Sequence, residues 1–193
     1  VKGFQGDNLA HLNTILACAK HFVGYGAAQA GRDYHTVNMG DNELRNVYMP
    51  PFKAAIDSGV ETFMTAFNEL NGVPATANQY IFKDILRDEW GFNGFVVTDY
   101  TAINELVSHG YAKNEKHATE LAINSAIDMD MMSGAYRRFL KELVSEGKVD
   151  EKLVNEACRR ILVAKFKLGL FDDPYRYSNE QRAKEIIYRP EFL

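Results

Sequence analysis

The sequence predicts an α/β protein in which helices alternate with the strands of a parallel sheet. Short apolar or β-branched runs, typical of buried strands, end near His21, Phe67, Asp99 and Asp130. These ends lie about 30 to 45 residues apart, which is the spacing of repeated βα units. Four such units are half of an eight-stranded barrel. We therefore predict a partial TIM-type (β/α) barrel of about four parallel strands with flanking helices. A small open sheet is the alternative.

The first unit begins with a predicted helix over residues 7–19, where apolar residues recur at the spacing of one helical face. A short strand follows over residues 18–23 and leads into a glycine-bearing turn. Residues 27–40 are polar and without periodicity, which predicts a long loop. A loop of this length in a compact domain is more often functional than idle.

The second unit opens with a helix predicted over residues 41–58, which has one apolar side and ends at Gly59. Pro50 and Pro51 lie inside this pattern and should kink or divide the helix, because proline cannot donate the backbone hydrogen bond. The second strand is predicted over residues 60–67. A loop dense in turn-forming residues comes after it.

The third unit carries the strand that matters most for function. Asn78 should cap a helix that ends at Gly91, and the run 94–98 reads as a buried strand ending at Asp99. The remaining predicted elements are a helix that begins at Ala102, a helix over 115–126, a fourth strand over 127–132, and two closing helices over 135–146 and 150–168.

Asp99 is the first candidate for chemistry. A carboxylate at the carboxyl end of a parallel strand lies where α/β proteins assemble their sites, because loops from neighbouring strands converge there. The alternative is that Asp99 only caps the helix that follows. Thr101 is a rival cap, since the helical pattern starts directly after it. If Thr101 is the cap, Asp99 is free to point into a site.

Composition limits the partners. The chain has 193 residues, of which 46% are hydrophobic and 25% charged, and a formal net charge of -4 without a basic run. This balance argues against nucleic acid or an anionic membrane as the main partner and favours a neutral small substrate. No stretch approaches the roughly 18 apolar residues of a membrane-spanning helix. The chain opens on Val1 rather than Met, so we expect it to be a piece of something longer, and its compartment cannot be read.

The two cysteines, Cys18 and Cys158, lie far apart within apolar stretches. We expect both to be small core residues rather than a disulfide or a metal site. No metal or other cofactor is expected.

Several segments together resemble glycoside hydrolase family three, in the order in which that family shows them. The resemblance covers nearly the whole chain and is closest to the bacterial β-glucosidase branch. The segments are Ala19–Phe22, Met49–Asp57, Asn68–Asn78, Leu86–Phe92, Gly94–Asp99 and Leu168–Tyr175.

That resemblance implies that residues 1–193 are the C-terminal half of the family's N-terminal (β/α) barrel domain. It implies a retaining glycosidase in which Asp99 is the nucleophile and Lys20 and His21 bind sugar hydroxyls. Met64 and Tyr100 resemble positions that line the same subsite, and Tyr100 stands where many relatives have Trp. The implied reaction is hydrolysis of terminal non-reducing β-D-glucosyl residues, in the periplasm or outside the cell.

Retention also needs a general acid/base roughly 5.5 Å from the nucleophile. This chain offers none, and in the β-glucosidase branch a second, α/β sandwich domain supplies it. We therefore expect the piece alone to be inactive. The alternatives are a β-xylosidase or other exo-β-glycosidase, a Schiff-base lyase or aldolase with Lys20 as nucleophile, and a non-catalytic carbohydrate-binding or structural piece.

Overall fold

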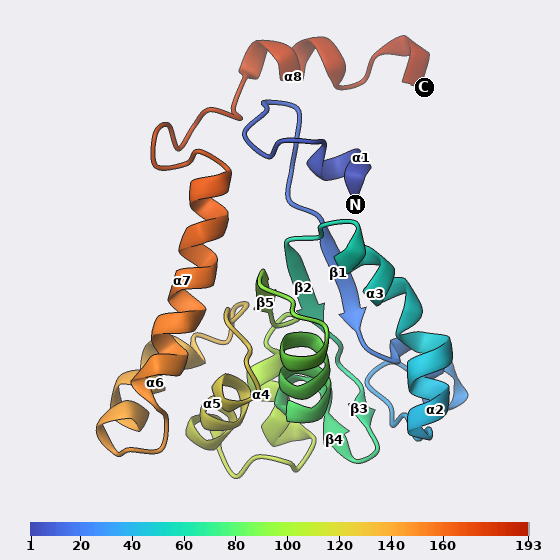
Figure 1. Cartoon of the computed structure of the whole chain (residues 1–193), viewed down its shortest axis with the longest axis vertical. Helices are drawn as coiled ribbons and strands as arrows, with labels where there is room; N and C mark the ends of the chain where they lie inside the picture. The colour runs from blue at the N-terminus through green and yellow to red at the C-terminus, as the bar shows by residue number, and fades with distance from the viewer. Residues whose placement is uncertain (193) are drawn as a thin grey trace.

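The structure, a computed structural model, describes residues 1–192. Its centre is a parallel sheet of three strands in the spatial order β1 (Cys18–Phe22), β2 (Thr62–Thr65) and β5 (Phe95–Val97), shown in Figure 1. Each strand of this sheet is added beside the one before it, with helices in the intervals. The α/β class with a parallel sheet is confirmed.

The fourth strand, predicted over residues 127–132, is wrong as a regular strand. Only one parallel bridge, Val97 with Met129, extends the sheet on that side. The ladder goes no further because the backbone N–H of Met131 donates to the Thr98 side chain at 2.8 Å rather than to a strand carbonyl. The segment still lies beside β5 and continues the order of the sheet.

Helices and one hairpin fill the connections between strands. The helices are α1 (Lys2–Gln5), α2 (Asp41–Glu43), η3 (Leu44–Tyr48), α3 (Pro50–Asp57), η5 (Tyr80–Glu89), α4 (Ala102–Ser108), α5 (Glu115–Asn124), α6 (Ala135–Ser145), α7 (Glu151–Lys167) and α8 (Glu180–Ile186). Shorter helical turns are η1 (Tyr25–Ala27), η2 (Gln29–Gly31), η4 (Ala75–Ala77) and η6 (Pro190–Phe192), and the hairpin is β3 (Glu69–Leu70) with β4 (Val73–Pro74).

The helix predicted over residues 7–19 is wrong. The chain there forms irregular turns up to β1, and the only helix before β1 is the short α1. Leu12 and Ile15 are 53% and 62% exposed, so the periodic apolar residues have no core to pack against in the described part of the chain. A short helix without such packing is only marginally stable in water, which explains why the pattern misled.

Two local predictions in the next units are confirmed. The helical stretch over residues 41–58 is divided at Met49, and Pro50 starts α3, where its missing N–H costs nothing. Asn78 caps the following helix, because its Oδ1 accepts the backbone N–H of Ile81 at 3.3 Å.

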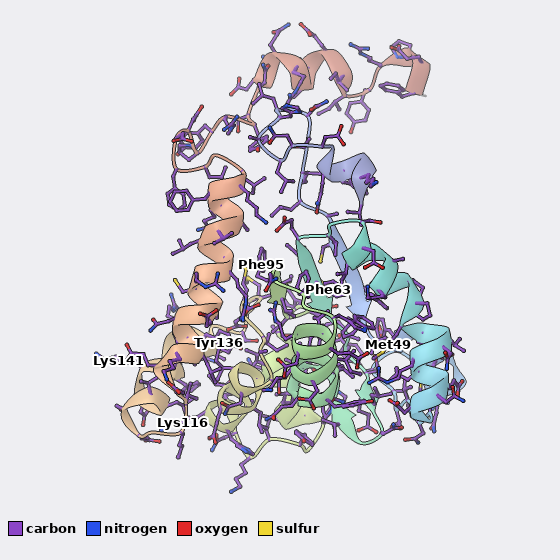
Figure 2. The ribbon with its side chains drawn as sticks, viewed as in Figure 1. Met49, Phe63, Phe95, Lys116, Tyr136 and Lys141 are labelled. Atoms are coloured by element: carbon purple, nitrogen blue, oxygen red, sulfur yellow. The ribbon has the colours of Figure 1, made fainter. Side chains whose placement is uncertain are left out.

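An aromatic cluster on one side of the sheet holds β1 and β2 in place. The ring of Phe22 meets those of Phe52, Phe63 and Phe82 edge to face, at centroid distances of 5.0, 5.4 and 5.3 Å. Phe63 and Met49 lie among the packed side chains beside α3 in Figure 2. Such pairs add to the stability gained from burial alone, so the strand ends that carry polar residues are firmly placed.

The prediction that both cysteines are core residues is wrong. Cys18 and Cys158 are free and exposed. Cys18 and Lys20 are the two exposed residues of β1, so neither side chain is packed into the aromatic cluster. Within residues 1–192 no helix is long and apolar enough to cross a membrane.

A buried group of charged side chains stabilises the amino-terminal part of β5. Asp128, whose side chain is 1% exposed, pairs with Arg87 from η5 and with Arg160 from α7, the latter at 2.8 Å. The backbone N–H of Val96 donates to the same carboxylate at 2.7 Å. We call Arg87, Asp128 and Arg160 the arginine clamp. Burial lowers the pKa of Arg87 to about 10, which leaves the guanidinium charged at neutral pH.

Candidate active site

Asp99 lies directly beyond β5, at the carboxyl edge of the parallel sheet. Its backbone N–H donates to Thr65 Oγ1 at 3.1 Å, and that hydroxyl is paired with Thr76 Oγ1 at 2.9 Å. Both threonines are buried. The backbone of Asp99 is therefore fixed to the end of β2, while its side chain remains 13% exposed.

The Asp99 side chain does not cap the helix that follows. It accepts only the N–H of the next residue, Tyr100, at 2.6 Å. The rival cap is not made either, because Thr101 at the N-cap donates its hydroxyl to the Tyr100 carbonyl and accepts nothing from α4. Neither predicted capping role is realised. The second oxygen of Asp99 is free for a partner outside its own loop.

That partner is His21, which comes from the end of β1. The distance from His21 Nε2 to Asp99 Oδ2 is 3.2 Å, and the His21 side chain is 28% exposed. Burial lowers the pKa of His21, and the nearby Asp99 carboxylate only partly opposes this. His21 is therefore largely neutral at pH 7, and its contact with Asp99 is between a neutral imidazole and a carboxylate.

Lys20 precedes His21 on β1 and is exposed. The peptide bonds Lys20–His21 and Phe22–Val23 are cis, and the pairing of β1 with β2 shifts register between Ala19 and Phe22. The structure records no ion pair between Lys20 and a carboxylate of residues 1–192. The charge of Lys20 is nevertheless close enough to His21 to lower its pKa. The ammonium group is thus available to a ligand.

The other two predicted residues, on β2 and after β5, are less directly joined to the Asp99 carboxylate. Met64 belongs to β2 and is partly buried, and Tyr100 is 56% exposed beside Asp99. Only the backbone of Tyr100 touches the Asp99 carboxylate, through the hydrogen bond described above. Their side chains could still line a bound ligand.

Sequence reasoning missed Tyr25 and Asp33, which adjoin the site. The Tyr25 ring contacts His21 at a centroid distance of 5.2 Å, and its hydroxyl donates to Asp33. Both residues lie in or next to the loop that the sequence marked only as long and aperiodic, so no spacing pointed to either of them. The sole signal was that a loop of that length is often functional.

One cavity of the structure lies away from this site. It measures about 480 Å³ and lies near the opposite end of the strands, between α1 and the residues that precede β2. None of Lys20, His21 and Asp99 lines it, and the directed polar groups that determine what a site can do lie at the strand ends instead. The described residues hold no group of three or more His, Cys, Asp or Glu that could bind a metal.

The fold and this carboxylate site can be compared with known proteins. The model of the "Glycosyl hydrolase family 3 N terminal domain" matches residues 1–164. The chain therefore belongs to glycosyl hydrolase family 3.

Individual relatives agree with that placement. A periplasmic β-glucosidase from Salmonella typhimurium is 42% identical over 186 residues, which are 96% of this chain and 24% of the relative. A β-xylosidase from Formosa agariphila is 38% identical over 89% of this chain and 25% of its own length. The crystal structure of a Listeria innocua β-glucosidase in complex with glucose has a TM-score of 0.93 and 43% identity, over 99% of this chain and 26% of that one. The chain thus spans about a quarter of the length of these relatives.

Proposed function

We propose that the protein to which this chain belongs is a retaining β-glucosidase that releases terminal non-reducing β-D-glucosyl residues, with Asp99 as its nucleophile. The observation that carries the proposal is the Asp99 carboxylate, which faces His21 at 3.2 Å at the carboxyl edge of the parallel sheet. A retaining enzyme needs an ionised carboxylate that attacks the anomeric carbon and later leaves. The Salmonella and Listeria relatives, both named β-glucosidases, support the choice of sugar.

The neighbouring groups suit a neutral, polyhydroxylated ligand. Lys20 and His21 provide directed hydrogen-bond donors for sugar hydroxyls, and Met64 and Tyr100 would line the ring of the bound sugar. Tyr100 offers an exposed aromatic face for stacking. In this proposal no cofactor takes part, since protonation and nucleophilic attack need only side chains.

We further propose that the three described strands are part of a closed (β/α) barrel and that residues 1–193 are the C-terminal half of that domain. The general acid/base, which a retaining enzyme needs roughly 5.5 Å from its nucleophile, would come from a further α/β domain. The name of the Salmonella relative supports a periplasmic location.

A β-xylosidase is the second candidate, and the Formosa relative favours it. The two sugars differ by the hydroxymethyl group of glucose. The test compares kcat/KM of the full-length protein for 4-nitrophenyl β-D-glucoside and 4-nitrophenyl β-D-xyloside. We expect the glucoside to be preferred by about tenfold or more. A preference for the xyloside would show that the protein is a β-xylosidase rather than a β-glucosidase, and would leave the proposed mechanism unchanged.

Retention is tested by NMR of the first product formed. The β-anomer of the sugar must be released before mutarotation. In Asp99→Ala, azide should replace the nucleophile, attack once and give the inverted α-glycosyl azide. Release of the α-anomer by the wild-type protein would overturn the retaining mechanism. Borohydride trapping of a carbonyl substrate on Lys20 would instead support the lyase alternative.

A further inference from the structure

The strongest unassigned feature is the loop after β1, where Tyr25 stands against His21. The two rings meet edge to face, with centroids 5.2 Å apart and planes at 67°. His21 is the side chain that contacts the Asp99 carboxylate. Whatever fixes the imidazole of His21 therefore also fixes that contact.

Tyr25 is itself held by its hydroxyl and by its ring. The hydroxyl donates to Asp33 Oδ1, and the same oxygen accepts the backbone N–H of Tyr34 at 2.9 Å. One carboxylate oxygen thus joins the side chain of Tyr25 to the backbone of the loop eight residues later. This hydrogen bonding limits rotation of the Tyr25 ring away from His21.

Phe67, which follows β2, supports the ring of Tyr25. Their centroids are 6.4 Å apart, and the Tyr34 ring lies 4.4 Å from the Phe67 ring. The carbonyl oxygen of Phe67 is 3.2 Å from His109 Nε2 at the end of α4. The support behind Tyr25 therefore comes from parts of the fold other than its own loop.

An imidazole without such a contact would be poorly oriented. Rotation of a histidine ring about its last side-chain bond has broad energy minima, so packing rather than intrinsic preference sets its orientation. A misplacement of about 1 Å in a reacting constellation can cost about 100-fold in rate. The ring of Tyr25 restricts this rotation and covers one side of His21.

We propose that Asp33 and Tyr25 form a brace that positions the His21 imidazole against Asp99, and that both are positioning residues for attack on the sugar. The inference rests on the proposed function, because it needs Asp99 as the nucleophile. It assigns a role to two residues of the loop that the proposed chemistry leaves unused.

The brace predicts two pH effects of opposite sign. The charged groups that face His21 are Asp99, Lys20 and Asp33. Burial lowers the pKa of His21, so replacing Tyr25 by a smaller residue admits water and raises that pKa. The Asp33 carboxylate raises the pKa of His21, so removing its charge lowers the pKa. Protonated His21 would hold Asp99 in an ion pair and weaken it as a nucleophile, which gives an acid limb in the pH profile.

The experiment measures kcat, KM and the pH profile of kcat/KM for the full-length protein with an activated aryl β-glucoside. Tyr25→Leu should lower kcat/KM by about 10 to 100-fold, because His21 both contacts Asp99 and binds the sugar, and should move the acid limb to higher pH. Asp33→Asn keeps an acceptor oxygen and should move the acid limb to lower pH. Tyr25→Phe keeps the ring and should leave the limb in place, with an intermediate kcat/KM.

A second Tyr–Asp pair in the chain provides the matched control. The Tyr80 hydroxyl donates to Asp41, and the structure joins neither residue to His21. Tyr80→Leu and Asp41→Asn should therefore keep the wild-type pH profile of kcat/KM. If Tyr25→Leu does not fold, Tyr25→Phe and Asp33→Asn decide the matter.

An unshifted acid limb in both Tyr25→Leu and Asp33→Asn would overturn the brace, as would loss of activity that only follows loss of folded protein. The inference fails alone if Asp99→Ala is inactive while the Tyr25 and Asp33 variants behave as wild type. If Asp99→Ala is fully active, Asp99 is not the nucleophile, and the proposed function and the brace are both wrong.

Discussion

Two carboxylates flank β5, and their surroundings differ. Asp128, near the amino end of the strand, is buried and receives donors from Arg87, Arg160 and Val96. Asp99, beyond the carboxyl end, has one oxygen on its own loop and the other facing a neutral, partly exposed His21. The first carboxylate has its hydrogen-bonding capacity filled by the protein, and the second has capacity left for a ligand.

The difference separates a structural acid from a candidate nucleophile. A buried carboxylate paired with two arginines joins η5, β5 and α7, and its side chain is only 1% exposed. A partly exposed carboxylate at a sheet edge can reach a substrate and form and break a bond with it. The same substitution at the two ends should therefore have opposite consequences for catalysis and stability.

The largest expected effect is on turnover in Asp99→Ala. Removal of the nucleophile should lower kcat by roughly four or more orders of magnitude, while the full-length protein keeps its folded stability. Sugar binding should largely remain, because Lys20 and His21 are still present. Steady-state kinetics and equilibrium dialysis with glucose measure the two quantities. A merely structural role as a cap would instead cost about 1 kcal/mol of stability and no activity.

Asp128→Ala should show the reverse pattern. It leaves Arg87 and Arg160 buried without their counter-ion, and breaking a buried pair in this way costs about 3 to 5 kcal/mol. Urea unfolding of the full-length protein, followed by fluorescence, measures the loss. The molecules that remain folded should keep a near-normal KM. Unchanged stability would show that the arginine clamp does not fasten β5.

The lysine of the site gives a smaller and more specific effect. Lys20→Ala should raise KM by about 10 to 100-fold, because it removes a hydrogen bond from a charged group to the sugar. The free energy of unfolding should stay unchanged, because Lys20 is exposed. Lys141, an exposed lysine at the outer side of α6 in Figure 2, is the matched control. Equal KM values in the two variants would remove Lys20 from the sugar-binding site.

The smallest effect concerns a surface cluster far from either end of β5. Lys116 and Lys148 hold the pKa of Glu146 at about 2, below its ordinary 4.5. A depressed folded-state pKa contributes stability above pH 4.5 that is lost as the pH falls toward 2. The stability difference between wild type and Glu146→Gln should therefore shrink over this range, and salt should reduce it at neutral pH. A difference that is independent of pH would contradict the ion pairing.

The sequence was informative where the pattern is local. The run before Asp99 predicted β5 because buried parallel strands are continuously apolar. Pro50 and Asn78 predicted a helix break and a helix cap because each acts within a few residues of itself. That Asp99 lies at the carboxyl edge of the sheet was also predictable, since the ends of parallel strands converge there, but its contact with His21 was not predicted.

The sequence failed where an element depends on distant partners. Periodic apolar residues such as Ile15 predicted a helix that nothing in the described part of the chain covers. Cys18 appeared to belong to the core because alternation along β1 does not reveal which face is packed. No spacing connects Arg87, Asp128 and Arg160, which come together only through the fold.

The most direct test of the central claim is covalent trapping of the nucleophile. An activated 2-deoxy-2-fluoro-β-glucoside forms the glycosyl ester readily, because a good leaving group needs little help from an acid, and the fluorine slows the release of the sugar. After protease digestion of the full-length protein, mass spectrometry should find the sugar on the peptide containing Val96 to Ile103, with fragmentation placing it on Asp99. Label on any other carboxylate, or none on an active enzyme, would contradict the account.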